Sequence, residues 1–400
     1  MCQIRKLFIV SAVWTGGIVM LALSKTKGVM HWEDSMSKNI VVFSDGTGQE
    51  GGKSFNTNVY KVFNIIEDRT PSQIAYYERG VGTDWRRLLG NAGGRGFSQK
   101  IYKCYKFIFD NYQSGDKIFL FGFSRGAATV RSLSGLIHMF GILPQARPEL
   151  IMMAYDIYRM SNSKAREAAA QDFIKRHHTM WCPIEFLGVW DTVAALGLPS
   201  RTLNVLVDKF PFWKHSFHNF KLSSSVRNGY HALAIDDERT AFIPTLWDGL
   251  SNREYQKMKQ VWFCGSHTDV GGGYVEAGGL SDIPLQWLVK CAQEHGLLIF
   301  GRPDPPLNAD PNKDLHDPRR GLLSKLLYRK RIRSWPAKEL GTPCVHESVP
   351  LRIVNRYNKP KPPYKPWILQ GPHDIEKDPY DGPIKPNSPL VRNGEQHQTH

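Results

Sequence analysis

The sequence predicts an α/β fold in which a mainly parallel β-sheet is covered by helices on both faces. From residue 39 onward, short apolar runs alternate with segments of helical periodicity. That alternation is typical of parallel strands joined by helical crossovers. Hydrophobic residues make up 41% of the chain and charged residues 22%, as in a globular protein. A length of 400 residues allows one large domain, or at most two.

The individual elements follow from local patterns. Strands are expected where β-rich apolar runs end in turn residues, at residues 40–43, 74–77, 117–123, 186–190 and 261–264. Helices are expected where apolar residues recur on one face, at residues 59–66, 97–109 and 125–139. His231 stands before Ala232-Leu233-Ala234, and we place it in a helix.

The first 35 residues differ from this pattern. They contain an apolar run, Leu7–Leu23, whose 17 residues are at the lower limit for a membrane span. The run also resembles a signal peptide with a poor cleavage site. Met36, directly before the first expected strand, offers an alternative start. We expect residues 1–35 to be an apolar segment and tether, so that the protein is membrane-associated through residues 7–23 if they are made and cytoplasmic otherwise.

The chain after residue 300 is proline-rich and basic. We expect residues 301–400 to form an extension of irregular surface structure with short helices, such as residues 322–328, and a disordered end. The net charge of the protein is +15, and residues 311–370 hold 14 Lys and Arg against 4 Asp and Glu. Such a region is either a solvated basic surface or a contact for an anionic membrane. No RNA-binding motif or zinc finger is present, so nucleic acid is not an expected partner.

The strongest chemical motif is Gly122-Phe123-Ser124-Arg125-Gly126, which fits the pattern Gly-x-Ser-x-Gly. A buried-strand run precedes it, and a helix start with small residues follows it. This context places Ser124 at a tight turn near a helix N-terminus, where backbone N–H groups can stabilise negative charge. The simpler interpretation is a β-to-α turn that merely contains serine. We predict that Ser124 is a nucleophile.

A serine hydroxyl needs a base to take its proton, and the base needs an acid to orient it. Asp191 leaves the end of the expected strand 186–190, whereas the alternatives Asp236, Asp237 and Asp248 lie in a polar loop region. Among 14 histidines, His267 is the best base, because it lies in a glycine-dense loop that leaves the strand 261–264. His231 is a weaker alternative.

An oxyanion hole requires two donors. We expect one to be the backbone N–H of Arg125, directly after the nucleophile, and the other to be the backbone N–H of Gly46 or Thr47 at an early strand end. Asp45 and Asp269 are expected to support the site, with a simple turn role as the alternative for Asp45. Six scattered cysteines without a Cys-x-x-Cys pair argue against structural zinc and a disulfide framework, and we expect neither a metal nor an organic cofactor.

These motifs together resemble a known family. They are Phe43-Ser44-Asp45-Gly46-Thr47, Gly122-Phe123-Ser124-Arg125-Gly126-Ala127, Val189-Trp190-Asp191-Thr192-Val193, Ala234-Ile235-Asp236-Asp237-Glu238-Arg239 and His267-Thr268-Asp269-Val270-Gly271-Gly272-Gly273-Tyr274. Their order is similar to that of an α/β-hydrolase-like family that includes phospholipase effectors of bacterial type VI secretion. The resemblance implies a triad of Ser124, Asp191 and His267 and a phospholipase activity of the A type.

The expected function is therefore that of a serine hydrolase acting on carboxylic esters of lipids, with its catalytic domain at residues 36–300. Two alternatives stay open. One is a carboxylesterase of small soluble esters. The other is a catalytically idle, membrane-associated binding protein on a hydrolase scaffold.

Overall fold

The computed structural model describes residues 37–46, 51–52, 56–80, 92–145, 147–193, 221–249, 254–274, 278–301, 303, 306–321, 325, 329–356 and 363–387. The expectations for residues 1–35, for Thr47, for most of residues 322–328 and for the chain after residue 387 fall outside these ranges. Within them, no helix combines the length and the apolar character needed to cross a membrane.

The centre of the fold is one eight-stranded sheet in the order β2-β1-β3-β4-β5-β6-β7-β8. Every neighbouring pair runs parallel, which confirms the predicted α/β-hydrolase-like architecture. The strands are β1 Asn39–Ser44, β2 Gln73–Glu78, β3 Lys117–Phe123, β4 Ile184–Trp190, β5 Val226–Ala234, β6 Lys257–Phe263, β7 Cys344–His346 and β8 Asp374–Glu376.

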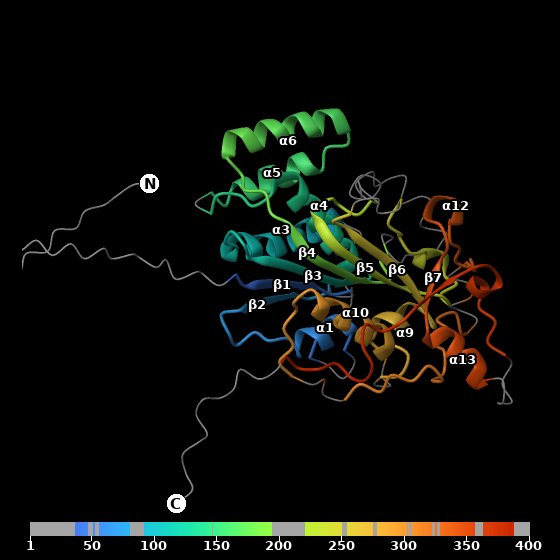
Figure 1. Ribbon diagram of the computed structural model, residues 1–400. Coiled ribbons are helices and arrows are strands. Elements are labelled where there is room, and N and C mark those ends of the chain that lie inside the picture. Colours follow the sequence, from blue (N-terminus) through green and yellow to red (C-terminus); the bar gives the residue numbers. More distant parts are fainter. Residues whose placement is uncertain are drawn as a thin grey trace, which may run out of the picture. The chain divides into compact units, whose positions relative to one another are not determined.

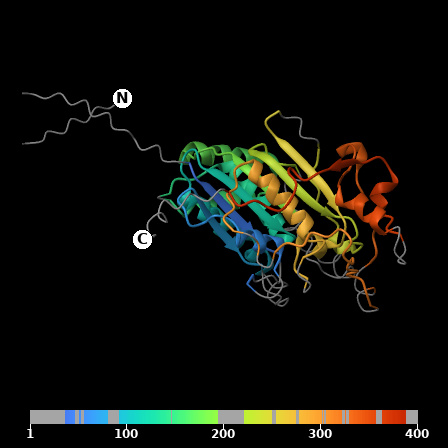
Figure 2. The same cartoon turned by 60° about the horizontal axis from the view of Figure 1, so that its bottom comes forward.

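Helices cover both faces of the sheet (Figure 1). One face carries α3 and α4 with α5 and α6 outside them, and the other carries α1, α9 and α10, as the turned view also shows (Figure 2). The described helices are α1 Asn58–Phe63, α3 Ala92–Asn111, α4 Arg125–Phe140, α5 Leu150–Tyr158, α6 Ser163–His177, α9 His267–Gly271, α10 Asp282–Glu294, α12 Ala337–Leu340 and α13 Ser348–Arg356.

The alternation of side chains along the strands builds a separate apolar core on each face. In β1, Val41 and Phe43 join the cluster under α1 and α10, whereas Ile40 and Val42 join the cluster under α3 and α4. A central parallel strand is therefore apolar at consecutive positions, because both of its faces are buried.

This two-sided burial explains one wrong prediction. We expected a helix around His231, but His231 lies in the middle of strand β5, between β4 and β6. The run Ala232-Leu233-Ala234 is buried on both faces of the sheet, and a short apolar run of this kind cannot be told from a helix by periodicity.

The expectation of irregular surface structure after residue 300 is also wrong in part. Strands β7 and β8 come from this region and extend the same sheet beyond β6. Each strand has only three residues, too few to show a period of two. β7 pairs with β6, which precedes it by some eighty residues, and β8 pairs with β7. No local signal therefore reveals either strand.

Because all strands run parallel, their carboxyl ends meet at one edge of the sheet, where ligands bind in open α/β folds. Five successive strands end there with residues singled out by the sequence. These are Asp45 after β1, Ser124 after β3, Asp191 after β4, Asp236 and Asp237 after β5, and His267 after β6.

The start of α4 passes so close to β1 that only glycine fits at residue 126. A Cβ built there would lie 2.0 Å from the carbonyl oxygen of Ser44. We predict that Gly126→Ala lowers the free energy of unfolding by about 1–3 kcal/mol, because backbone must move to relieve the overlap. A lowered Tm in calorimetry would measure the loss.

Gly371→Ala is the matched control for this substitution. No atom lies within 4 Å of a Cβ at Gly371, and its φ is −126°. The Tm of this variant should stay at the wild-type value. Equal Tm values for the two variants would show that the α4–β1 approach tolerates a side chain.

Candidate active site

Ser124 occupies the sharp turn between β3 and α4. Its φ of 57° and ψ of −121° cost a non-glycine residue on the order of 1–3 kcal/mol. Hydrogen bonds on both sides hold this backbone: Ser124 N–H donates to Trp190 O at 3.1 Å, and Ala128 N–H donates to Ser124 O at 3.2 Å. The Ser124 side chain makes no capping bond to α4. The serine is thus presented at a helix N-terminus by a strained turn, the geometry of a nucleophile elbow.

Asp191 follows β4 directly and is completely buried. It too has a positive φ, 39°, and its N–H donates to Ala232 O of the neighbouring strand at 2.8 Å. Its carboxylate is turned toward the β6 end of the sheet. Oδ1 accepts from Ala234 N at 3.0 Å, and Oδ2 is 2.6 Å from Nδ1 of His267.

His267 is the first residue of α9. A reciprocal capping box between Ser266 and Asp269 fixes the start of this short helix, and the His267 N–H donates to Asp237 Oδ2 at 3.1 Å. The imidazole packs against the rings of Phe123 at 4.6 Å and Phe242 at 5.0 Å between centroids. Backbone and ring are therefore both held, and the side chain is only 6% exposed.

The electrostatics favour a neutral imidazole with one defined tautomer. Burial lowers the pKa of His267, and the hydrogen bond and negative charge of Asp191 offset part of that effect. Since Nδ1 faces a carboxylate at 2.6 Å, Nδ1 carries the proton and Nε2 keeps its lone pair. A neutral Nε2 is what general-base chemistry requires.

Ser124 and His267 are neighbours through Phe123. The Phe123 ring packs on the imidazole, and Ser124 is the next residue in the chain. Within the described ranges, no hydrogen bond joins the Ser124 hydroxyl to His267. Catalytic hydrogen bonds often form only when substrate binds. The lack of a hydrogen bond between Ser124 and His267 in the described ranges is therefore compatible with proton transfer between these two side chains.

Of the expected oxyanion donors, Arg125 is the first residue of α4, where backbone N–H groups have no partner within the helix. Gly46 lies beside Ser124, because a Cβ built on Gly46 would be 3.4 Å from Ser124 Cβ. Its N–H, however, donates to the carboxylate of Asp45 at 2.6 Å. Gly46 would have to exchange this partner in order to bind an oxyanion.

Asp45 links the β1 loop to its surroundings. Its Oδ2 accepts from the hydroxyls of Thr57 and Tyr77, both at 2.6 Å. Thr57 also caps α1 and pairs with Gly272 of the histidine loop. Burial raises the pKa of Asp45, against these hydrogen bonds. Asp45 therefore connects the loop at Gly46 to the loop of His267, and its observed side-chain partners are Gly46, Thr57 and Tyr77.

Asp269 forms a second carboxylate–imidazole pair, with His316 rather than with His267. Its Oδ1 is 2.6 Å from Nδ1 of His316, and its Oδ2 accepts from Ser266. The His316 ring stacks on Tyr274 at 3.9 Å. Asp269, Tyr274 and His316 line a cavity of about 290 Å³ beside α9. Asp269 thus anchors α9 to the chain after residue 301.

The alternative residues from the sequence have other partners. Asp236 and Asp237 bind the backbone of the histidine loop, at Gly265 N and His267 N, and Asp248 is exposed. His231 is fully buried and accepts the Thr192 N–H at 3.1 Å. Burial, helped by the nearby charge of Arg131, lowers the pKa of His231 to about 3. His231 is a packed structural histidine.

Arg333 contacts Asp191 in the structure, although no sequence pattern predicted a role for it in the site. It comes from the region expected to be a surface extension, yet its side chain is 0% exposed and pairs with Asp191 at 2.6 Å. Burial alone would raise the pKa of Asp191, but the Arg333 guanidinium and the bond to His267 hold that pKa well below its usual range. One arginine among many in a basic segment carries no local sign of such a role.

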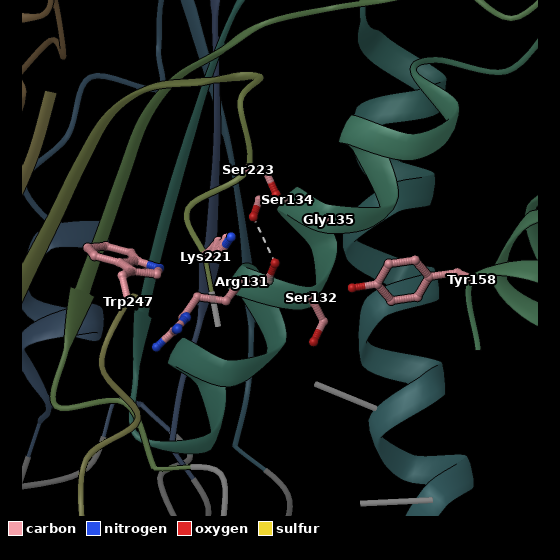
Figure 3. A pocket seen from close by; sticks show the side chains of 8 residues that line it. All are labelled: Arg131, Ser132, Ser134, Gly135, Tyr158, Lys221, Ser223 and Trp247. Atoms are coloured by element: carbon pink, nitrogen blue, oxygen red, sulfur yellow. Dashed lines mark hydrogen bonds between the residues drawn. The ribbon is translucent and has the colours of Figure 1, made fainter. Parts of the chain in front are cut away.

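A second cavity follows α4 away from Ser124 (Figure 3). Arg131 points across it toward Trp247 and donates to the carbonyl oxygens of Thr245 and Leu246. The volume of this cavity is about 10 Å³, room for about one water molecule. Thr245 N–H in turn donates to Thr192 O, next to Asp191, at 2.8 Å. Arg131 therefore braces the loop beside the site rather than binding a substrate.

Neither a metal nor a disulfide is evident in the described ranges. They contain no group of three or more His, Cys, Asp and Glu side chains placed to hold a metal ion. The five cysteines in these ranges are free.

Comparison with known proteins identifies the family of this chain. The family described as "T6SS, Phospholipase effector Tle1-like, catalytic domain" matches residues 38–291. The chain belongs to this family. The family is one of phospholipases, so the chain carries the catalytic domain of a lipid-ester hydrolase family.

Several known proteins are similar to this chain. The uncharacterized protein YEL023C of Saccharomyces cerevisiae is 27% identical over 306 residues, which cover 70% of this chain and 43% of that protein. The chain thus spans less than half the length of this relative. An uncharacterized protein from Pseudomonas aeruginosa aligns at 16% identity and a TM-score of 0.39, over 72% of this chain and 48% of its own. The Tle1 effector, solved bound to the VgrG spike of the type VI secretion system, aligns at 18% identity and a TM-score of 0.33. The alignment covers 60% of this chain and 52% of the effector chain.

The two buried histidines, His231 within β5 and His267 at the start of α9, should respond very differently to removal. We predict that His267→Ala lowers kcat for ester hydrolysis by on the order of 10³-fold or more, because the base is lost. His231→Ala should lower Tm and leave kcat within about tenfold, because the hydrogen bonds of His231 are to the Thr192 N–H and to the side chain of Gln260. Steady-state kinetics of both variants on one soluble ester would decide, and the reverse ranking would contradict our assignment of the base.

Proposed function

We propose that this protein is a serine hydrolase that cleaves carboxylic esters of lipids, with an A-type phospholipase activity. The observation that carries the proposal is the 2.6 Å contact between Asp191 and His267 beside the strained backbone of Ser124. An acid, a base and a hydroxyl that follow three strands of one sheet match the order serine, acid, histidine of this fold.

In the proposed reaction, Ser124 Oγ attacks the ester carbonyl carbon while His267 Nε2 takes the hydroxyl proton. Asp191 stabilises the imidazolium that forms. The carbonyl oxygen becomes an oxyanion, for which the Arg125 N–H and the loop at residues 46 and 47 are the proposed donors. Collapse expels the alcohol, which receives the proton from His267. Water then hydrolyses the acyl-enzyme by the same steps in reverse and releases the fatty acid.

A lipid substrate is supported by membership of a phospholipase family. An anionic membrane surface is the proposed second partner, through the basic region 311–370. Its exposed cations include Arg329, Lys330 and Arg331. Ile332, the next residue in the chain, is 54% exposed, and Val354 of the same region is 67% exposed. Cations mixed with exposed apolar groups suit the interface of an anionic bilayer.

We predict that Ser124→Ala abolishes ester hydrolysis and labelling by a fluorophosphonate probe while leaving the fold intact, because the hydroxyl forms the covalent intermediate. Mass spectrometry should place the label of the wild-type protein on Ser124. Unchanged turnover in the variant would overturn the mechanism, and an unlabelled, inactive wild type would favour the idle scaffold.

The substrate class needs its own measurement. The wild-type protein should release fatty acid from diacyl phospholipids in vesicles and leave the phosphate-bearing headgroup attached to glycerol, as A-type cleavage requires. Activity confined to short, soluble esters, with intact phospholipids across a panel of headgroups, would favour a carboxylesterase instead.

A further inference from the structure

Arg333 and Asp191 form an ion pair that is closed to solvent. Both side chains are 0% exposed. Arg333 Nη1 donates to Asp191 Oδ1 at 2.6 Å, and Nη2 donates to Oδ2 at 2.9 Å. Two parallel bonds of this kind fix the distance and also the plane of the carboxylate.

The hydrogen-bonding capacity of Asp191 is filled by this arrangement. An ionised carboxylate offers about four acceptor positions. Two are used by Arg333, one by Ala234 N at 3.0 Å and one by His267 Nδ1 at 2.6 Å. No position is left for a competing donor, so the lone pair that faces His267 cannot turn elsewhere.

Arg333 is itself anchored to the site's backbone. Its remaining Nη protons are donated to two backbone carbonyl oxygens, Ala234 O at the end of β5 and Phe242 O, each at 2.6 Å. The ring of Phe242 packs on the imidazole of His267. Only its Nε lacks a partner within the described ranges. The guanidinium therefore ties the acid, the β5 end and the Phe242 loop into one rigid unit.

The charges around His267 come from every element packed against it. The charged residues are Asp191, Asp236, Asp237, Arg239, Asp269 and Arg333, and the titratable side chain of His316 pairs with Asp269. Asp191 and Asp237 attract a proton to the imidazole, and each has its own guanidinium, Arg333 for the first and Arg239 at 2.6 Å for the second. The pairing leaves no net charge on these four groups.

We propose that Arg333 is a positioning residue of this active site, which aligns Asp191 toward His267 and limits how strongly that carboxylate favours the protonated imidazole. The inference rests on the proposed function. Acting through Asp191, Arg333 keeps His267 a neutral base to lower pH than an unpaired buried carboxylate would allow. It also makes the segment around residue 333 part of the catalytic unit.

The sign of the effect follows from the charges. Removing the guanidinium leaves Asp191 unpaired and raises the proton affinity of the Asp191–His267 pair. The base is then lost at higher pH, so the acid limb of kcat/KM moves upward. A role in stability alone would lower Tm and the amount of folded protein, but would not move this limb.

The test is the pH dependence of kcat/KM for a soluble p-nitrophenyl ester, with the full chain carrying Arg333→Gln or Arg333→Lys. We expect Arg333→Gln to lose on the order of 10–100-fold in kcat and to shift the acid limb upward by about one pH unit. Arg333→Lys keeps the charge but lacks the bidentate fork. It should keep the wild-type acid limb and still lose kcat.

Arg352→Gln is the matched control. Arg352 is also fully buried, also lies after residue 301, and binds the backbone carbonyl oxygens of Pro311 and Lys313. Its loss should lower Tm while leaving the acid limb in place. If Arg333→Gln behaves in the same way as Arg352→Gln, with an unshifted limb, Arg333 is structural only and the inference is overturned.

Two further outcomes are decisive. If Arg333→Gln does not fold, Arg333→Lys decides: reduced kcat at an unshifted acid limb supports positioning, and wild-type kcat overturns it. Fluorophosphonate labelling of wild-type Ser124 separates this question from the proposed function. A wild type that is labelled and active with an unaffected Arg333→Lys refutes only the role of Arg333, whereas an unlabelled wild type refutes the serine mechanism itself.

Discussion

The buried Asp191 carboxylate is the interaction on which the rest of the site depends. An ionised carboxylate without water is costly unless every acceptor position is satisfied. Here the donors come from β5, from α9 and from a segment some 140 residues away along the chain. If any one of these elements were displaced, the charge would lose a donor and Asp191 would lose its orientation. The orientation of Asp191 therefore depends on all three elements being in place.

Backbone strain is concentrated at the same place. Three non-glycine residues in the described ranges have positive φ, and two of them, Ser124 and Asp191, follow the adjacent strands β3 and β4. The bond from Ser124 N to Trp190 O ties one strained residue to the strand that ends at the other. Strands buried on both faces supply the rigidity that holds these conformations. Accordingly, the tight packing of α4 against β1 at Gly126 contributes to the geometry of Ser124 as well as to stability.

Motifs that combine a strand end with glycines located Ser124, Asp191 and His267 in the sequence, because both the strand and the turn are encoded locally. The parallel sheet was predictable for the same reason. The strand around His231 was not, since apolar residues buried on both faces lack a period, and β7 and β8 were not, since three residues carry no pattern. Arg333 was out of reach because its role arises from partners far along the chain. Nothing in the residues next to it distinguishes a buried arginine from a solvated one.

The basic residues after residue 300 consequently fall into two classes, buried and exposed, which amino-acid composition cannot distinguish. Arg333 and Arg352 are fully buried and bind Asp191 and backbone carbonyl oxygens, whereas Arg329 and Arg331 are exposed. The family match ends at residue 291, so the guanidinium that binds Asp191 lies outside the range by which the family is recognised. The environment of Asp191 therefore depends on a residue beyond that range. The exposed residues Arg329 to Ile332 directly precede Arg333, whose side chain is closed to solvent by Asp191 and the backbone around it.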